Sequence, residues 1–186
     1  MKLDRIYTRG GDSGATSLGD GTRVPKHSLR VRAMGSVDEA NAAIGVAALH
    51  LGPELRGMVM RIQNDLFDLG ADLCVPEKQS AGRERLRIAA GQVAALEREI
   101  DRLNEGLAPL TTFVLPGGSP ASAHLHLART IARRAERDVS ELAAGEPINP
   151  ELVKYLNRVS DLLFVMARYA NDRGAADVLW QPGLNR

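Results

Sequence analysis

Apolar residues recur at alternating steps of three and four positions through most of this chain. In residues 53–73 the spacing is kept by Leu55, Val59, Ile62, Leu66, Leu69 and Leu73. Such a spacing lines the side chains up along one face of an α-helix. Because residues 93–107 and 152–170 repeat it, each of these three segments is predicted to be a helix that lends one face to a shared core.

Helix-start signals set further boundaries. Pro53 suits the first turn of a helix, and Ser119-Pro120 and Asn149-Pro150 each place a capping residue directly before a proline. The helix that starts at Pro120 is expected to reach about Ala143. Its predicted core stripe consists of Leu125, Ala128, Ala132, Ala135, Val139 and Leu142.

The first helix has two candidate starts. Ser36-Val37-Asp38-Glu39 fits a capping box, in which the serine and the glutamate satisfy free backbone N–H groups. The alternative is that residues 29–34 extend the same helix backward through Gly35. In both cases the helix is expected to end near His50-Leu51-Gly52.

Four segments show no helical period. Residues 1–28 are dense in Gly, Asp, Ser and Thr, which predicts an ordered or ligand-ordered loop segment. Residues 75–90 are expected to form a surface connection, and residues 109–118 a short extended piece that ends in a turn. A polar tail follows Gly174.

The composition narrows the fold class. A chain of 186 residues with 44% hydrophobic residues can bury the core of one domain, and 4% aromatic residues favour helices over sheets. We therefore expect an all-α, five-helix antiparallel bundle with an N-terminal nucleotide-binding loop, forming a single domain over residues 1–186. Within it, residues 1–28 would bind phosphate, residues 29–172 would form the bundle, and residues 173–186 would be a tail.

Charge and cysteine content bear on partners and location. Lys and Arg number 24 against 23 Asp and Glu, so the net charge of +1 gives no overall field for nucleic acid or an anionic membrane. The apolar stretches fall short of the about 20 residues that span a bilayer. Cys74 is the single cysteine, and the first residues lack the apolar run of a signal peptide. We expect no nucleic-acid or membrane partner, and a cytoplasmic location.

Residues 8–16 read Thr-Arg-Gly-Gly-Asp-Ser-Gly-Ala-Thr, a combination of glycines and hydroxyls. Glycines let backbone N–H groups close on phosphate oxygens, while Arg9 or Lys26 would add positive charge. The segment resembles a phosphate cradle, although it does not match the G-x-x-x-x-G-K-[ST] pattern and no apolar strand precedes it. A flexible N-terminal arm is the alternative, and the loop alone leaves both interpretations open.

A row of arginines supplies a second candidate. Arg129, Arg133 and Arg137 recur every four residues on the fourth predicted helix, with Glu136 beside them, and so share one side. Three guanidinium groups in one line could bind a polyphosphate. The alternative is a solvated charged face, and Arg134, about 100° around the helix, suits that interpretation.

Other polar residues carry weaker signals. Asn157 and Asp161 lie one turn apart beside the seam of the fifth helix, where they could bond a base or a ribose. Hydrogen bonding between helices is the alternative. His124 and His126 are two positions apart and therefore point to different faces, so no metal ligand is assigned. Cys74 is interpreted as a small core residue.

Several motifs occur together in one order along the chain. They are Tyr7-Thr8-Arg9-Gly10-Gly11-Asp12-Ser13-Gly14, Gly35-Ser36-Val37-Asp38-Glu39-Ala40-Asn41, Phe113-Val114-Leu115-Pro116-Gly117-Gly118, Ala128-Arg129-Thr130-Ile131-Ala132-Arg133-Arg134-Ala135-Glu136-Arg137 and Tyr155-Leu156-Asn157-Arg158-Val159-Ser160-Asp161. This set resembles the PduO-type ATP:cob(I)alamin adenosyltransferases, which transfer the 5′-deoxyadenosyl group of ATP to the cobalt of a corrinoid. Two departures stand out: relatives commonly read T-K-T-G-D where this chain has T-R-G-G-D at residues 8–12, so an arginine replaces a lysine and a hydroxyl is absent.

The resemblance implies a five-helix bundle that forms a homotrimer, with active sites between adjacent subunits. It implies that ATP is bound by residues of the N-terminal segment and of two helices: Thr8, Arg9, Gly10, Gly11, Thr16, Lys26, Arg133, Arg134, Glu136, Arg137 and Asn157. Four residues are candidates for a catalytic role. Arg133 would hold the triphosphate, Phe113 would lie at the lower face of the corrinoid, and Asp38 and Arg129 would form an ion pair between subunits.

The chemistry of the implied reaction agrees with these residues. Cob(I)alamin is itself a strong nucleophile, so its attack on the ribose 5′-carbon needs no side chain as a base. The departing triphosphate needs cations, including Mg²⁺, to stabilise its charge. A corrinoid reductase and a B12-dependent mutase are the expected protein partners. Two other functions stay open, namely an ATP-dependent kinase and a non-catalytic nucleotide-binding helical adaptor.

Overall fold

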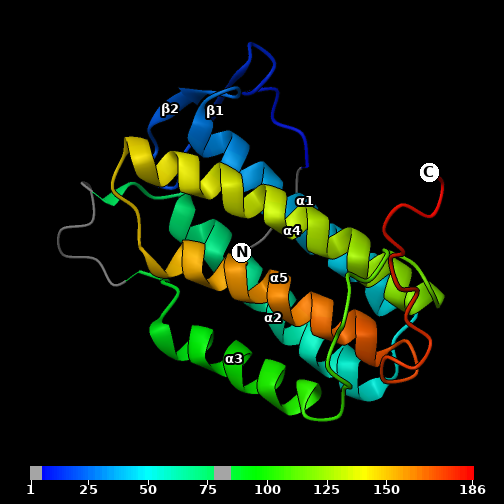
Figure 1. Cartoon of the computed structure of the whole chain (residues 1–186). Helices are drawn as coiled ribbons and strands as arrows, with labels where there is room; N and C mark the ends of the chain where they lie inside the picture. The colour runs from blue at the N-terminus through cyan, green and yellow to red at the C-terminus, as the bar shows by residue number, and fades with distance from the viewer. Residues whose placement is uncertain (1–5, 78–84) are drawn as a thin grey trace.

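The structure is a computed structural model, and it describes residues 6–77 and 85–186. Within these residues the chain forms five helices: α1 (Leu29–Ala48), α2 (Pro53–Leu73), α3 (Ala90–Asn104), α4 (Pro120–Gly145) and α5 (Glu151–Tyr169). A small hairpin of β1 (Ala15–Ser17) and β2 (Arg23–Pro25) precedes them (Figure 1). The prediction of an all-α, five-helix bundle is confirmed.

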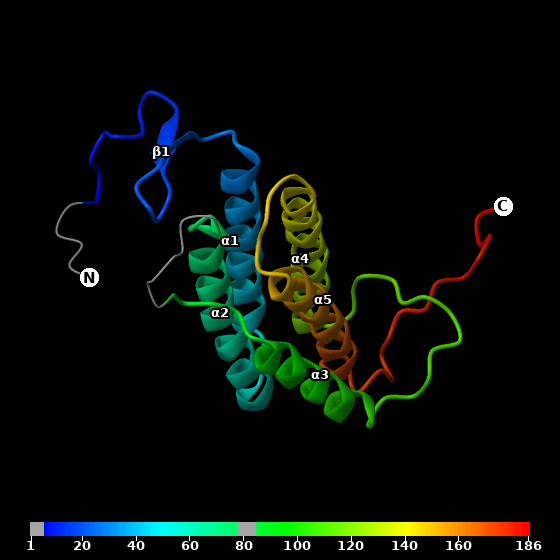
Figure 2. The ribbon, with the colours of Figure 1, turned by 90° about the vertical axis from the view of Figure 1, so that its left-hand side faces the viewer.

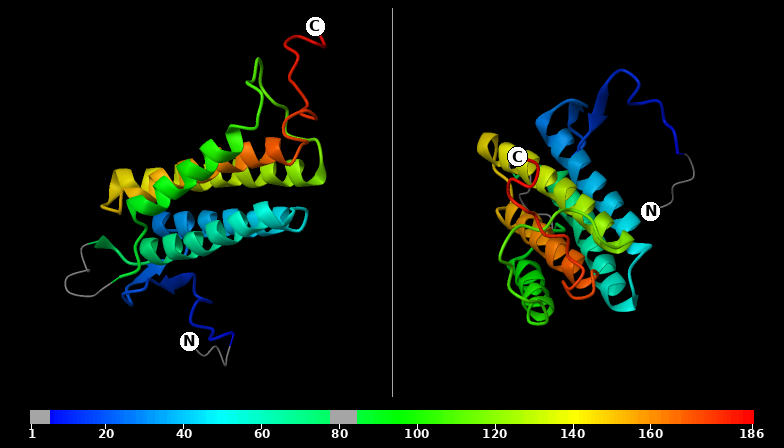
Figure 3. Two further views of the ribbon diagram at one scale, coloured as in Figure 1. Left: turned by 90° about the horizontal axis from the view of Figure 1, so that it is seen from below. Right: turned by 45° about the vertical axis from the view of Figure 1, so that its right-hand side comes forward.

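The helices lie in two layers. Seen from below, α1 and α2 form one layer, and α4, α5 and α3 form the other (Figure 3, left). α1 packs against α2 and α4, α4 packs against α5, and α3 lies along α5 at the side of the bundle (Figure 2). Neighbouring helices α1 and α2, and α4 and α5, run antiparallel because short turns join them.

The predicted apolar stripes build the core. All six stripe residues of α2 and all six of α4 are buried, and Tyr155 joins the buried residues of α5. In the third and fifth helices the stripes are buried except for Ile100 and Ala170, which are partly covered and pack against the core. Burial of these side chains between the two layers supplies the main driving force for the fold.

The proposed capping box at Ser36 is wrong as a helix start, and the alternative is correct. α1 begins at Leu29 and runs unbroken through Gly35, because Ala33 and Val37 continue one buried stripe across that point. The hydroxyl of Ser36 instead donates a hydrogen bond to the carboxylate of Asp138 on α4. Ser36 therefore ties two helices together in mid-helix.

The starts of the last two helices agree with the sequence signals. The hydroxyl of Ser119 accepts a hydrogen bond from the backbone N–H of Ser122 at 3.2 Å, as an N-cap does. The side-chain oxygen of Asn149 accepts one from the N–H of Glu151 at 3.1 Å, so it performs the capping contact although the helix begins two residues later. α4 continues past the predicted Ala143.

The N-terminal segment contains more regular structure than the predicted loop. Its hairpin pairs Thr16 with Val24 in antiparallel register. Leu18 in the hairpin turn is buried, and the N–H of Gly19 donates to the carbonyl of Cys74 at 2.9 Å. The hairpin is thereby attached to the end of α2. Residues 78–84 of the predicted connection lie outside the described residues.

The predicted tail also takes part in the fold. Val114, in the expected extended piece, forms an antiparallel bridge with Leu179 near the C-terminus. This pairing lies at the end of the bundle where α4 begins and α5 ends (Figure 1). Among the described residues, no helix has the length and apolar character to cross a membrane.

Candidate functional site

The glycine-rich loop is held in shape by two basic residues of the hairpin. The guanidinium of Arg23 donates to the carbonyl of Gly10 at 2.8 Å and to the hydroxyl of Ser17 at 3.3 Å. The backbone N–H of Lys26 donates to the carbonyl of Gly14 at 2.8 Å. These contacts fold the loop back over the hairpin, so that its exposed glycines are presented on a defined scaffold.

Gly11 allows the amine of Lys26 to approach the loop. A Cβ atom on Gly11 would lie 2.9 Å from Lys26 Nζ, which is closer than side chains tolerate. Gly14 has a φ of 81° and Arg9 a φ of 59°, so the backbone turns through the left-handed region on both sides of Gly11. A lysine amine beside backbone N–H groups in such turns is an arrangement suited to phosphate oxygens.

The other predicted loop residues lie close by. Thr8 and Arg9 are exposed, and the guanidinium of Arg9 lies over the ring of Tyr7 at 5.8 Å from its centroid. Thr16 lies in β1 rather than in the loop. The structure therefore brings Thr8, Arg9, Gly10, Gly11, Thr16 and Lys26 together in one segment.

The arginine row of α4 changes from buried to exposed along its length. Arg129 is half-buried, whereas Arg133 and Arg137 are exposed. The guanidinium of Arg137 donates to the backbone carbonyl of Arg133 at 3.1 Å, so it lies back along the helix toward Arg133. Burial, followed by the neighbouring charge of Arg133, lowers the pKa of Arg129.

Two carboxylates border this row on the side of α5. Asn157 donates from its amide to the carboxylate of Glu136 at 2.9 Å, so these two predicted ATP-binding residues are already paired. Burial raises the pKa of Asp161, and the charge of Glu136 also raises it, while Arg158 and Arg133 act in the opposite direction. The face formed by α4 and α5 thus combines exposed arginines with carboxylates that can accept hydrogen bonds.

Arg134 does not share the side of the row. Its guanidinium forms an ion pair with Glu39 on α1. The contact lies between the two layers of the bundle and continues a series of α1–α4 contacts that includes the ion pair of Arg32 with Asp138 at 3.3 Å. In this structure Arg134 therefore joins α4 to α1.

A buried polar cluster on α4 had no signal of its own in the sequence. Ser122 and His126 are 0% and 1% exposed. Among the residues that the structure describes, the hydroxyl of Ser122, both ring nitrogens of His126 and Nε of Arg129 have no hydrogen-bond partner. The ring of Phe164 lies against both His126 and Arg129, at 6.0 and 5.9 Å. Burial, followed by the charge of Arg129, lowers the pKa of His126.

Phe113 lies in the loop that precedes α4, outside the helix itself. Its side chain is 76% exposed, and its only ring neighbour among the described residues is Trp180, with centroids 5.9 Å apart. Phe113 belongs to the loop before Pro120, and Arg133 follows Pro120 by about 20 Å of helix. One helix therefore carries the cationic row, while the exposed aromatic residue lies beyond its start.

Asp38 and Arg129 are not paired within one chain. Asp38 is exposed on α1, beside a groove between α1 and α2 that Met34 and Phe67 also line. Arg129 lies on α4, in the other layer (Figure 3, left). The N-terminal segment projects on the side of α1, away from α5 (Figure 3, left). A single chain thus separates the glycine-rich loop from the face formed by α4 and α5.

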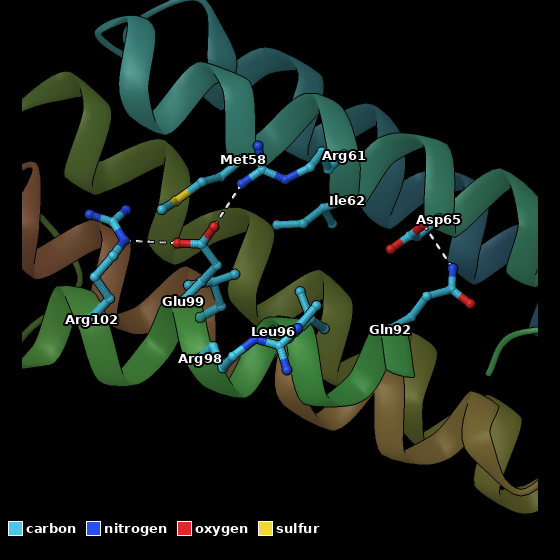
Figure 4. A pocket seen from close by; sticks show the side chains of 11 residues that line it. Met58, Arg61, Ile62, Asp65, Gln92, Leu96, Arg98, Glu99 and Arg102 are labelled. Carbon is cyan, nitrogen blue, oxygen red and sulfur yellow. Dashed lines mark hydrogen bonds and ion pairs between the residues drawn. The ribbon is translucent and has the colours of Figure 1, made fainter. Parts of the chain in front are cut away.

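A separate hollow of about 320 Å³ lies between α2 and α3 (Figure 4). Glu99 in its wall is paired with Arg61 at 2.8 Å and with Arg102 at 3.0 Å. Asp65 accepts hydrogen bonds from Gln92 and from the buried hydroxyl of Tyr155, both at 2.8 Å. These contacts join α3 to the bundle, and none of the predicted site residues lines the hollow.

The fold and these groups together define a helical-bundle protein equipped to bind a polyphosphate, with an exposed aromatic residue in the loop before α4. A sequence profile described as cobalamin adenosyltransferase matches residues 6–170. The chain therefore belongs to the cobalamin adenosyltransferase family, and the resemblance inferred from its motifs is confirmed.

Individual relatives agree along nearly the whole chain. The corrinoid adenosyltransferase of Mycobacterium tuberculosis is 50% identical over 191 aligned positions, which cover 100% of this chain and 97% of the relative. The cobalamin adenosyltransferase of Cupriavidus metallidurans is 48% identical, covering 97% and 96%. A solved variant of the PduO-type ATP:corrinoid adenosyltransferase from Lactobacillus reuteri, complexed with cobalamin and ATP, superposes with a TM-score of 0.89 at 34% identity, covering 96% and 97%.

Proposed function

We propose that this chain transfers the 5′-deoxyadenosyl group of ATP to cob(I)alamin. The cobalt(I) centre attacks the ribose 5′-carbon and supplies both electrons of the new cobalt–carbon bond. The bond from that carbon to the triphosphate oxygen breaks, and its electron pair leaves with inorganic triphosphate. The products are adenosylcobalamin and triphosphate, and no side chain has to remove a proton.

The observation that carries this proposal is the similarity to a relative complexed with both cobalamin and ATP, which extends over 96% of the chain. The local chemistry supports it independently. Arg133 and Arg137 are exposed cations on one side of α4, and Lys26 stands over Gly11 in the loop. A leaving triphosphate gains negative charge at its bridging oxygen, and prepositioned cations and N–H groups stabilise that charge.

In this proposal, two copies of the chain build each active site, and three copies form a ring. The loop of one copy, with Thr8 to Gly11, Thr16 and Lys26, would close on the α4–α5 face of the next. That face would add Arg133, Arg137, Glu136 and Asn157. The separation of loop and arginine row to opposite layers supports this arrangement, because an interface that repeats head to tail can close a ring.

The subunit contact would also pair groups that a single chain leaves unpaired. Asp38 would meet Arg129 of the neighbouring copy, and the exposed Phe67 in the α1–α2 groove would be covered. Within the described part of the chain, Nε of Arg129 has no hydrogen-bond partner, which is unfavourable for a half-buried guanidinium. Arg134 enters the proposal only through its helix contact, which would hold α4 in register beside the bound ATP.

Phe113 is proposed to lie at the lower face of the corrinoid. An aromatic ring there excludes a lower axial ligand from cobalt, and a cobalt without that ligand is easier to reduce from Co(II) to Co(I). The exposed fraction of Phe113, 76%, supports a role in contact with a ligand rather than in the core.

Mg²⁺ is proposed to arrive with the triphosphate. Among the described residues, no three His, Cys, Asp or Glu side chains gather in a way that could hold a metal ion. Mg²⁺ on nucleotides is commonly held by phosphates and one or two carboxylates, and Glu136 beside the arginine row fits that requirement. A corrinoid reductase, a B12-dependent mutase and a cytoplasmic location remain predictions.

The direct test is anaerobic incubation of the protein with ATP, Mg²⁺ and chemically reduced cobalamin. The proposal expects the absorbance spectrum of a cobalt–carbon bond together with inorganic triphosphate. Release of ADP would identify a kinase instead. A folded oligomer that binds ATP and forms neither product would favour the non-catalytic adaptor.

A further inference from the structure

The last residues of the chain run beside the loop that carries Phe113. The backbone N–H of Trp180 donates to the carbonyl of Phe113 at 2.8 Å, and the N–H of Leu115 donates to the carbonyl of Val178 at 2.7 Å. The hydroxyl of Thr112 donates to the carbonyl of Trp180 at 3.1 Å. The ring of Trp180 lies against the ring of Phe113 at an angle of 49°. Residues 178–180 therefore support both the backbone and the ring of Phe113.

A buried ion pair precedes this tail strand. Nε of Arg168, near the end of α5, lies 2.8 Å from a carboxylate oxygen of Asp177, and the two side chains are only 6% and 3% exposed. A second nitrogen of the same guanidinium donates to the carbonyl of Ala108 at 2.9 Å, where the Phe113 loop begins. One cation thus joins the start of the loop to the start of the tail strand.

The other end of the loop meets the same cluster through Asn171. Its amide oxygen accepts a hydrogen bond from the N–H of Ser119 at 3.0 Å. Its amide nitrogen donates to the carbonyl of Ala176 at 2.7 Å and to Asp177 at 3.3 Å. The start of the loop, the end of the loop and the tail are therefore joined by the buried side chains of Arg168, Asn171 and Asp177.

The chain path after α5 is shaped to bring Asp177 back to Arg168. Asp172, Arg173 and Gly174 all have positive φ values, of 53°, 49° and 85°, which reverse the chain direction. A Cβ atom on Gly174 would lie 3.1 Å from a guanidinium nitrogen of Arg168 and 3.3 Å from the Asp177 carboxylate. The turn therefore brings the Asp177 carboxylate close to Arg168 and leaves space for the ion pair between them.

We infer that the buried Arg168–Asp177 pair is a positioning pair for Phe113, which acts by fixing the tail strand at residues 178–180. Phe113 is largely exposed and packs against few other side chains. The position of its ring therefore depends on the position of the tail strand at residues 178–180. A misplacement of about 1 Å in such a contact is enough to cost a large factor in rate. The inference rests on the proposed function of Phe113 at the corrinoid.

The test compares Asp177→Asn with Asp172→Asn, a matched control that removes an exposed carboxylate from the same turn. Trp180 is the only tryptophan of the chain, so its fluorescence reports the tail without any substrate. Asp177→Asn is expected to shift the emission to the red and to increase quenching by acrylamide. The control is expected to match the wild type.

Activity is then measured from two starting points, preformed cob(I)alamin, and cob(II)alamin with a mild reductant. With Asp177→Asn, the rate of adenosylcobalamin formation from cob(II)alamin is expected to fall by about tenfold or more. The rate from cob(I)alamin should change little, and the KM for ATP should not change. Unchanged emission with unchanged rates would overturn the inference, and so would equal losses from both starting points in a folded protein. If the emission shifts but the wild type forms no adenosylcobalamin, the anchoring stands and the proposed function fails.

Loss of the acid leaves Arg168 buried without its partner, which can unfold a protein, so helix content is checked by circular dichroism. If Asp177→Asn does not fold, Trp180→Ala tests the tail contact through which the pair is inferred to act, because it removes the ring behind Phe113 and leaves the ion pair in place. Selective loss of the cob(II)alamin route supports the inference. No loss, or equal loss from both starting points, contradicts it.

Discussion

Gly118 shows at the scale of one residue how the Phe113 loop depends on close backbone approach. Its φ is 94°, and a Cβ atom there would lie 2.4 Å from the side-chain oxygen of Asn171. Both facts exclude a side chain at this position without local rearrangement. At the neighbouring Gly117, no atom of the described residues other than its chain neighbours lies within 4 Å of such a Cβ position.

Gly118→Ala is therefore expected to destabilise the fold by about 1–3 kcal/mol, from backbone strain together with displacement of Asn171. Urea unfolding followed by circular dichroism measures the effect, with Gly117→Ala as the control. Equal midpoints for the two variants would show that the approach of Asn171 is not tight.

Arg133 is the residue on which the triphosphate site depends most in this account. Its replacement by alanine is expected to lower kcat/KM for ATP by about 100-fold or more, because the leaving group loses a prepositioned cation. Arg98→Ala removes an equally exposed arginine from α3 and should leave the rate unchanged. Steady-state kinetics at saturating cob(I)alamin make the comparison, and similar rates for both variants would remove Arg133 from the site.

At the scale of elements, His126 makes the packing of α4 on α5 sensitive to pH. Burial lowers its pKa below the ordinary value of 6.5, with Arg129 acting in the same direction and Asp177 in the opposite one. The unfolded chain therefore binds a proton near pH 6.5, where the folded chain does not. Stability contributed by the neutral ring is complete above this pH and falls as the pH decreases below it.

His126→Gln is expected to flatten this dependence. Between pH 7 and about pH 5, the melting temperature of the wild type should fall further than that of the variant, because glutamine gains no charge. His27→Gln, at an exposed histidine of the N-terminal segment, should behave as the wild type does. Parallel pH profiles for all three proteins would show that His126 does not resist protonation.

The helices could be predicted from the sequence because their signal is local. The stripes of α2 and α4, and the proline starts at Pro53 and Pro120, lie within a few residues of the structure they specify. Pairing of Val114 with Leu179 could not be predicted, because the strands are short and a sequence does not say which distant segment completes them. From the sequence alone, the tail is therefore recognisable only as a polar segment.

Part of the candidate site could also be predicted, because helical spacing is a local signal in the sequence. Arg133 and Arg137 lie on one exposed side, as their spacing required, and Glu136 meets Asn157. The rotation that turns Arg134 to Glu39 depends on how α4 packs on α1, which spacing alone does not determine. The Arg168–Asp177 pair could not be predicted from the sequence because an unusual backbone turn, not helical periodicity, brings the two side chains together.

At the scale of the whole molecule, one chain does not complete the proposed site. The loop with Lys26 lies on the side of α1, while Arg133 lies on α4 in the other layer (Figure 3). The loop before α4, which carries Phe113, lies at the opposite end of the bundle from the hairpin (Figure 1). A neighbouring copy must therefore supply the loop to each proposed site.

Complementation between inactive subunits tests that claim most directly. Lys26→Ala and Arg133→Ala are each expected to abolish most adenosylcobalamin formation. In oligomers mixed from equal amounts of both, about a quarter of the sites would combine an intact loop with an intact α4 face, and about a quarter of the wild-type activity should return. Mixing Arg133→Ala with Arg137→Ala, two changes on the same face, should restore none. Activity of the Lys26→Ala and Arg133→Ala mixture that stays at the level of the separate variants would contradict a site shared between subunits.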